Sequence, residues 1–172
     1  MKARIPERKR ILNPKARPTI RAMLSRCAAQ TMIEVFDWGG SGERLQRMEA
    51  EIKKTLDEYD GKYKDSGDEL AAMVKDARVV GVEYPFRPGS GEKVLVGREH
   101  DIYFLATLMA LRRKGYAEMR LARFQSELCR RIRYYNSTFD GAPEVVLDVM
   151  DNKLGRYGKV PSEQFAPANK NV

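Results

Sequence analysis

The composition of this chain excludes a membrane-spanning protein and a small domain held together by disulfides. Its 172 residues suffice for one compact domain or two small ones, and 42% of them are hydrophobic, which is enough for a core. No apolar run approaches the ~20 residues that a membrane span needs, and only two cysteines occur. We therefore expect a protein of the reducing cytoplasm without a membrane partner.

The net charge of +8 is unevenly distributed along the chain. Residues 1–30 carry nine Lys/Arg against one acid, residues 34–78 carry twelve acids against eight bases, and residues 112–133 carry eight bases against two acids. The sequence is thus a basic arm followed by an acidic half and a basic half. Such an asymmetry is typical of proteins with polyanionic partners.

The first half of the chain predicts a basic arm and three helices. Residues 1–18 lack the apolar stretch of a secretory signal, and we expect them to form a flexible arm. Apolar residues then recur at the three- and four-residue spacing of amphipathic helices, separated by turns rich in glycine, aspartate and serine. The helices are expected near 19–37, 43–60 and 67–78.

The segment after these helices predicts a β-hairpin connector over residues 82–99. The β-forming runs VVGVEY (79–84) and KVLVG (93–97) flank turn residues rich in proline and glycine. Because a lone hairpin is marginally stable in water, it must pack on the helices or add to another sheet. Three more helices are expected near 101–114, 117–135 and 141–154, the first with Asp101 as its N-cap. Residues 159–172 have no periodicity and are expected to be disordered.

An internal duplication underlies this order of elements. Residues 31–60 align with 107–136 without a gap, at a shift of 76 positions. The identical pairs are Thr31/Thr107, Gly39/Gly115, Arg44/Arg120, Leu45/Leu121, Arg47/Arg123, Glu51/Glu127 and Tyr59/Tyr135. The sequence therefore predicts a mainly α fold with a small β-hairpin, built from two tandem three-helix repeat units at residues 19–81 and 100–158.

No catalytic or metal-binding constellation is present in the sequence. His100 is the only histidine, and no further ligand lies at a spacing that would complete a metal site with it. Phosphate-binding P-loops and nucleophile elbows are also missing. We therefore expect a non-enzymatic protein without a cofactor, in which His100 is a residue of the hairpin exit or a helix cap.

The basic half predicts a binding surface for nucleic acid. Cations gather at the end of one expected helix and along the next one, with Tyr134 beside them. Guanidinium groups bind phosphates bidentately, and an adjacent aromatic ring stacks a base. The alternative is a solvated face, partly neutralised by pairs within the helix. The predicted nucleic-acid-binding residues are Arg8, Lys9, Arg10, Arg112, Arg113, Lys114, Arg120, Arg123, Arg130 and Arg131.

Two further features leave alternatives open. The turn at Gly39–Gly42 opens a helix and could bind a phosphate, but we interpret it as a simple turn because the second copy lacks the second glycine. The acids of the first half could dock the other copy, pair in a homodimer, or mimic a nucleic-acid backbone toward a basic protein. The predicted protein-binding residues are Glu49, Asp57, Glu58 and Asp60.

The opening residues Met1–Pro6 and the stretch W-G-x-G-x-x-R-L-x-R-M, Trp38 to Met48, resemble small proteins of phages and prophages of Gram-positive gut bacteria. Those proteins carry one copy of an aromatic-G-x-G-x-x-R-L-x-R-F unit, and this chain looks like a duplicated member. The second copy departs from the motif because it lacks the aromatic-G-x-G.

The resemblance implies a phage accessory protein that acts in the cytoplasm of a bacterial host cell. Such proteins, when basic and without catalytic residues, tend to be DNA-binding regulators or inhibitors of host defence. We therefore expect binding to nucleic acid or to a nucleic-acid-loaded effector such as a guide-loaded nuclease, with an anti-CRISPR inhibitor as the specific form. The alternatives are a DNA-binding regulatory or packaging accessory protein of a prophage, and a structural scaffold that dimerises through its acidic half.

Overall fold

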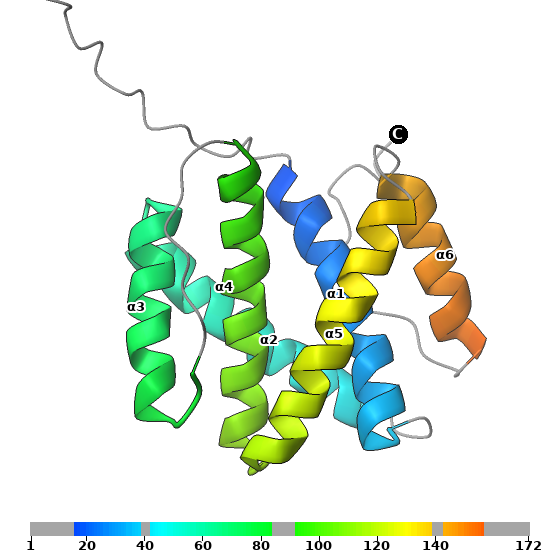
Figure 1. Ribbon diagram of the computed structural model, residues 1–172, viewed down its shortest axis with the longest axis horizontal. Coiled ribbons are helices and arrows are strands. Elements are labelled where there is room, and N and C mark those ends of the chain that lie inside the picture. Colours follow the sequence, from blue (N-terminus) through cyan, green and yellow to red (C-terminus); the bar gives the residue numbers. More distant parts are fainter. Residues whose placement is uncertain (1–15, 39–41, 84–91, 139–142, 157–172) are drawn as a thin grey trace, which may run out of the picture.

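The computed structural model describes residues 16–38, 42–83, 92–138 and 143–156, and these residues form helices connected by turns (Figure 1). The helices are α1 (Ala16–Phe36), α2 (Gly42–Lys62), α3 (Ser66–Val79), α4 (Glu92–Arg113), α5 (Glu118–Thr138) and α6 (Pro143–Arg156). The mainly α fold class is thereby confirmed. None of these helices combines the length and the apolar character that crossing a membrane requires.

The predicted β-hairpin is not found in the described part of the chain. Residues 93–97, the expected second strand, lie inside α4, which begins at Glu92. Asp101, the expected N-cap, consequently lies in the middle of α4. The physical reason is that each residue added to an existing helix gains a backbone hydrogen bond, whereas an isolated hairpin is marginal in water. Residues 84–91, the expected hairpin turn, lie outside the described residues, as does the whole expected tail, residues 159–172.

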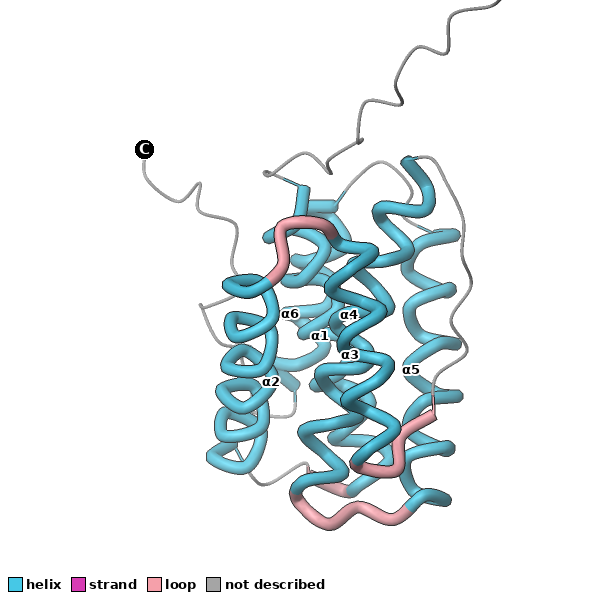
Figure 2. Tube along the Cα trace, turned by 90° about the vertical axis from the view of Figure 1, so that its left-hand side faces the viewer, coloured by secondary structure: helices cyan, strands magenta, loops and turns pink. Residues whose placement is uncertain are grey.

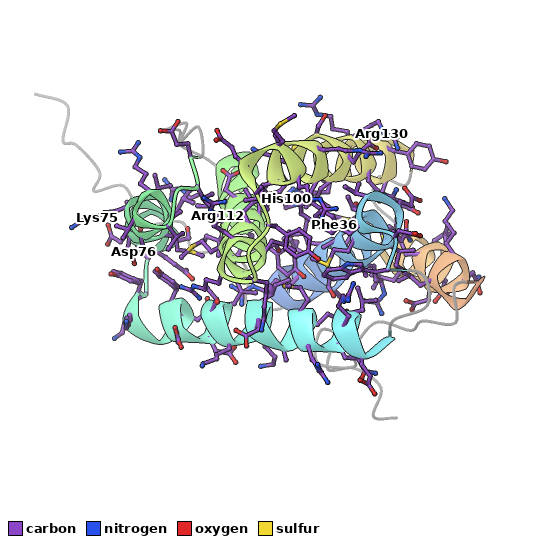
Figure 3. All side chains as sticks on the ribbon, turned by 90° about the horizontal axis from the view of Figure 1, so that it is seen from below. Phe36, Lys75, Asp76, His100, Arg112 and Arg130 are labelled. Carbon is purple, nitrogen blue, oxygen red and sulfur yellow. The ribbon has the colours of Figure 1, made fainter. Side chains whose placement is uncertain are left out.

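The helices of the two predicted units are exchanged in their packing. α1 and α4 lie side by side and run in the same direction (Figure 1). α1 packs most extensively on α5 and α6, whereas α4 packs most extensively on α2 and α3. The first helix of each unit therefore contacts the second and third helices of the other unit more than those of its own. α2 and α5 lie on opposite sides of the central pair (Figures 2 and 3).

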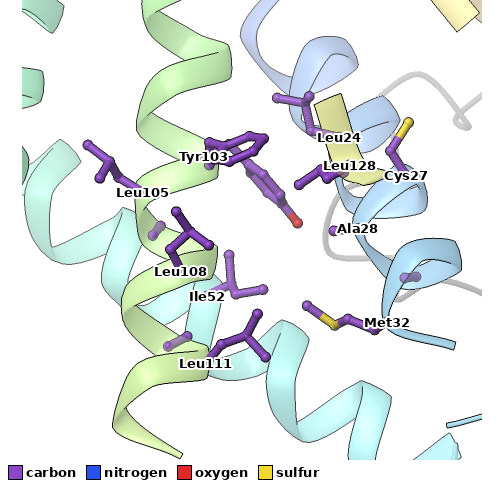
Figure 4. Close-up of a cluster of buried hydrophobic side chains, with 14 of the residues drawn as sticks. Leu24, Cys27, Ala28, Met32, Ile52, Tyr103, Leu105, Leu108, Leu111 and Leu128 are labelled. Carbon is purple, nitrogen blue, oxygen red and sulfur yellow. The ribbon is translucent and has the colours of Figure 1, made fainter. Parts of the chain in front are cut away.

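A single hydrophobic core extends through all six helices. Tyr103 of α4 lies at its centre and reaches toward Leu24 of α1 and Leu128 of α5 (Figure 4). Equivalent positions of α2 and α5 are buried alike. These pairs are Leu45/Leu121, Met48/Phe124 and Ile52/Leu128.

The identical residues Thr31 and Thr107 also have the same environment. Both are fully buried on the central helices, and each hydroxyl donates a hydrogen bond to the carbonyl oxygen four residues earlier, at 2.7 Å and 2.8 Å respectively. Such a bond satisfies a hydroxyl that would otherwise be buried without a partner. The shared environment is what a duplication requires, although the duplication itself stays a prediction.

Two buried arginines connect α1 to three other helices. The guanidinium of Arg21 donates to both carboxylate oxygens of Asp60 on α2, at 2.6 and 2.8 Å, and to Glu99 on α4 at 3.4 Å. Arg26 donates to both carboxylate oxygens of Asp151 on α6, at 2.7 and 3.2 Å. Bidentate pairs of this kind fix orientation as well as distance. They hold α1 in register between the two halves of the fold.

The exchanged packing predicts that the chain survives a cut between its halves. We expect a protein with a protease site inserted within residues 84–91 to remain one particle of the intact mass, 19.7 kDa plus the insert, after complete cleavage. The reason is that the apolar faces of α1 and α4 are buried against helices on the other side of the cut. Size-exclusion chromatography and native mass spectrometry of the cut protein measure this.

The uncut protein is the control, and denaturant should release the two fragments from the cut one. Separation of the fragments in native buffer would contradict the exchanged packing.

Candidate nucleic-acid interface

The ends of α1 and α4 form matching helix caps at the lower end of the molecule (Figure 1). In each cap a residue shortly after the helix adopts the left-handed conformation. These residues are Asp37, with φ 57°, and Gly115, with φ 92°. The next residue, Trp38 or Tyr116, donates its backbone N–H to the carbonyl oxygen five residues earlier, at 3.2 Å in both caps. This is the Schellman arrangement of a helix C-terminus. It places two aromatic rings beside each other at the meeting point of the two halves.

These rings pack together with two phenylalanines. Phe36 contacts both cap residues, with ring centroids 5.6 Å from Trp38 and 4.5 Å from Tyr116. It also stacks on Phe124 of α5 at 5.6 Å. The rings of Trp38 and Tyr116 are 6.0 Å apart in an edge-to-face arrangement. Centroid distances of 4.5–7 Å are favourable for aromatic pairs. This cluster of four aromatic rings therefore packs as part of the hydrophobic core and against it.

A pocket of about 520 Å³ opens over this aromatic cluster. Both halves of the chain contribute to its walls, from the two caps and from the first turns of α2 and α5. We call it the cap pocket. Its lining residues are Trp38, Glu43, Arg44, Arg47, Met48, Lys114, Gly115, Tyr116 and Arg120.

The walls of the cap pocket are strongly cationic. The Arg44 guanidinium lies over the Trp38 ring at 5.6 Å, and the Arg120 guanidinium lies over the Tyr116 ring at 5.9 Å. Arg44 and Arg120 are equivalent positions of the two predicted units. Cation–π contacts of this length hold the guanidinium groups in place while leaving their N–H groups free for an anion. With Arg47 and Lys114 the pocket has four cations against one acid, Glu43, which pairs with Arg47 at 3.4 Å.

A line of arginines continues from the cap pocket along α5. Arg120, Arg123 and Arg130, which we call the α5 stripe, are all exposed. At 100° per residue, Arg123 and Arg130 are rotated from Arg120 by about 60° and about 80° in the same direction, so the three lie on one flank of the helix. Their Cα atoms span about 15 Å along the axis. Arg130 forms one exposed ion pair, with Glu127 at 3.0 Å.

Three of the predicted phosphate ligands have other partners in the fold. Arg112 donates to the carbonyl oxygens of Val80, at 3.2 Å, and Tyr116, at 3.0 Å, and so fastens the α3–α4 connection to the cap of α4. Arg113 points toward α2, where it donates to the Thr55 hydroxyl at 3.5 Å. Arg131 is buried, and it donates to Gln30 at 2.9 Å and to Glu34 of α1.

The prediction that Arg131 belongs to an exposed ridge is therefore corrected. It lies at the edge of the buried face of α5, where it packs against α1. Lys114, Arg120, Arg123 and Arg130 are exposed, as predicted. Arg8, Lys9 and Arg10 lie outside the described residues.

Fewer of the predicted acidic residues are exposed in the structure than the sequence predicts. Glu49 is buried, 4% exposed, and accepts a hydrogen bond from the Ser25 hydroxyl at 3.4 Å. Asp60 is bound by Arg21 as described above. Only Asp57 and Glu58 of the four predicted acids are exposed, and Asp57 pairs with Lys53 at 2.8 Å. The assignment of Glu49 to an exposed binding surface is thus corrected.

The cap pocket includes four residues that were not assigned to the binding site from the sequence: Trp38, Arg44, Arg47 and Tyr116. The sequence did contain a signal, because R-L-x-R occurs in both copies at equivalent positions. It could not reveal that Tyr116 takes the place of Trp38, since the two caps are offset by two residues from the alignment. In the first copy the aromatic residue precedes the glycine (Trp38, Gly39), whereas in the second copy it follows the glycine (Gly115, Tyr116).

The histidine and the two cysteines of the chain do not line the cap pocket. In the described part of the chain no group of three or more His, Cys, Asp or Glu side chains is placed to hold a metal ion. Burial raises the pKa of the Cys27 thiol to about 12, which keeps it protonated and unreactive. His100 is partly buried on α4, away from the cap pocket, and burial lowers its pKa from 6.5, partly opposed by Glu99.

Adjacent arginines on α5 provide a test of these assignments. Arg131→Gln should lower the free energy of unfolding by about 2 kcal/mol, because it removes the shorter of the two hydrogen bonds that the buried Gln30 accepts and the ion pair with Glu34. Arg130→Gln should change it by less than about 0.5 kcal/mol, because the ion pair of Arg130 with Glu127 is exposed. Urea denaturation of the two variants measures both values. Equal effects would contradict the placement of Arg131 in the core.

The lowered pKa of His100 predicts a dependence of stability on pH. Between the folded pKa and the unfolded value near 6.5, the unfolded chain binds more protons, so stability falls as the pH decreases through this window. His100→Gln should remove that part of the decrease between pH 7.5 and pH 5.5, which urea denaturation at both pH values would detect. An unchanged pH dependence would show that the His100 environment is not as described.

Comparison of the chain with protein-family models, with curated proteins and with solved structures found no match.

Proposed function

We propose that this chain is a non-enzymatic, phage-derived protein that binds nucleic acid, either free or within a nucleoprotein effector. The observation that carries the proposal is the cap pocket, where four cations and two aromatic rings converge from both halves of the chain. Phosphate groups are bound by guanidinium and ammonium groups, and bases stack on aromatic rings and on guanidinium planes. Trp38 is buried and supports Arg44 from within the core, whereas the half-buried Tyr116 and the exposed guanidinium groups offer surfaces for stacking and for phosphate.

The extent of the cationic surface favours a polymer over a small anion. A single phosphate or carboxylate would occupy only part of a pocket of about 520 Å³. The α5 stripe adds charge along about 15 Å beyond it. A nucleic-acid backbone carries one negative charge per phosphate along its whole length, and it can therefore neutralise the pocket and the stripe together.

The acidic half offers less support as a mimic of nucleic acid. Of its four predicted acids only Asp57 and Glu58 are exposed, and these alternate with Lys53 and Lys54 on the same surface. A backbone mimic needs a row of unpaired acids. We therefore propose the cationic site, rather than the acidic one, as the functional surface.

The specific form that we propose is an anti-CRISPR inhibitor, which would bind an RNA-guided nuclease through the nucleic acid that the nuclease carries. This form rests on the resemblance to phage accessory proteins and on the charge of the site. A DNA-binding regulatory or packaging accessory protein would use the same residues. The two are distinguished by the target, since the regulator would bind free DNA at least as well as a guide-loaded nuclease.

Removal of charge from the cap pocket and the α5 stripe should weaken binding and reduce its dependence on salt. We expect the combined change of Arg44, Lys114, Arg120 and Arg123 to Gln to lower affinity by about 100-fold or more at 0.1 M salt. The slope of log K against log salt should fall in magnitude by about 3, because each lost phosphate contact retains its counterion. Fluorescence anisotropy with labelled oligonucleotides measures both quantities, and a guide-loaded nuclease serves as a second ligand.

The matched control changes Lys54, Lys62, Lys64 and Lys75 to Gln. It removes the same charge from exposed positions on α2, α3 and their connection. Stability of both variants should be nearly unchanged, since exposed charges contribute little to folding. Equal losses in the two variants would mean that only net charge matters, and unchanged binding in the first variant would refute the proposed site.

A further inference from the structure

A second cation-lined pocket lies at the other end of the α5 stripe. It has a volume of about 380 Å³ and lies between α5, α1 and α6. We call it the far pocket. Its lining residues are Gln30, Glu34, Arg130, Arg131, Tyr134, Tyr135 and Lys153. Arg130 is shared by the far pocket and the α5 stripe, and Figure 3 places it on the part of α5 nearest α6.

The far pocket combines an exposed ring with an unbalanced positive charge. The Tyr134 side chain is 51% exposed, yet its ring is held edge-to-face against the buried Tyr135 at 5.3 Å. The Lys153 ammonium lies 5.7 Å from the centre of the Tyr134 ring. Glu34 is the one acid among the lining residues, and it accepts a hydrogen bond from Arg131. Arg130 has an exposed pair with Glu127, so the far pocket keeps a net positive charge, with the Lys153 ammonium as the cation that an anion can neutralise.

The two pockets and the stripe lie along one line on the surface of α5. Tyr134 lies 14 positions after Arg120 on α5. About the helix axis it is rotated from Arg120 by about 40°, in the same direction as Arg123 and Arg130. The line from Arg120 to Tyr134 is about 21 Å long. At the rise of 3.4 Å per nucleotide of a stacked strand, this length corresponds to about six nucleotides, and to fewer when the strand is extended.

We propose that the bound nucleic acid is a single strand, which runs along α5 from the cap pocket to the far pocket. This inference rests on the proposed function and specifies its ligand. Each pocket is a hollow with an aromatic ring and cations, which fits an unstacked base and its phosphate. In a duplex the bases are stacked on one another and present only their edges in the grooves, so no base face could stack on a ring in either hollow. The aromatic rings at both ends of the line are thus explained by single-strand binding.

Tyr134 is the residue that separates this inference from simple charge attraction. Tyr134→Ala should lower affinity for an eight-nucleotide thymidine strand about tenfold, because a base loses its stacking surface. Tyr134→Phe keeps the ring and should retain the affinity of the natural chain. For a DNA duplex of 20 base pairs, neither variant should differ from the natural chain. Anisotropy titrations at one fixed salt concentration measure all these values, with RNA strands of the same length as a parallel series.

Strand length provides the second readout. Affinity for thymidine strands should increase up to about six nucleotides and change little beyond that, since the line on α5 is then filled. Preference for the duplex, or an equal loss of duplex and single-strand binding in Tyr134→Ala, would overturn the single-strand inference while leaving nucleic-acid binding intact. Absence of binding to every strand and duplex would overturn both the inference and the proposed function.

Discussion

The central pair of parallel helices determines the rest of this structure. α1 and α4 have apolar residues around most of their circumference, so both must be surrounded by other helices. Their contact with each other leaves two sides to be covered, and each is covered by the last two helices of the opposite unit. Because α1 and α4 run in the same direction, their C-terminal caps meet at one end of the molecule. The cap pocket is the direct result of this meeting.

The positive charge of the chain serves two separate purposes. Arg21, Arg26 and Arg131 are buried and hold α1 against α2, α4, α5 and α6. Exposed cations such as Arg44, Arg120 and Arg123 have no comparable structural role and gather at the cap pocket and along α5. Net charge and its distribution along the sequence cannot separate these groups, because burial depends on which helix lies opposite. The separation is visible only once the exchanged packing is known.

The sequence alone was sufficient for the helices and insufficient for the contacts between them. Apolar spacing located five helices to within a few residues, and the buried faces of α2 and α5 follow the pattern of Leu45, Met48 and their equivalents. It failed at residues 93–97, where β-forming residues continue a helix. It also failed for Glu49 and Arg131, whose positions flank an apolar stripe and are covered by α1. The aromatic pair of the cap pocket required the geometry of two helix ends, which no local pattern contains.

The two sides of the cap pocket differ in their residues. Its two sides belong to one polypeptide, so the effective concentration of one side near the other is fixed and the site persists at any dilution. A site made by two identical chains would have two identical sides. Here Lys114 and Glu43 distinguish the sides, and only one of them leads into the α5 stripe. A nucleic-acid strand has a 5′ and a 3′ end, and the site has a matching sense of direction, so the two orientations of a strand are not equivalent on this surface.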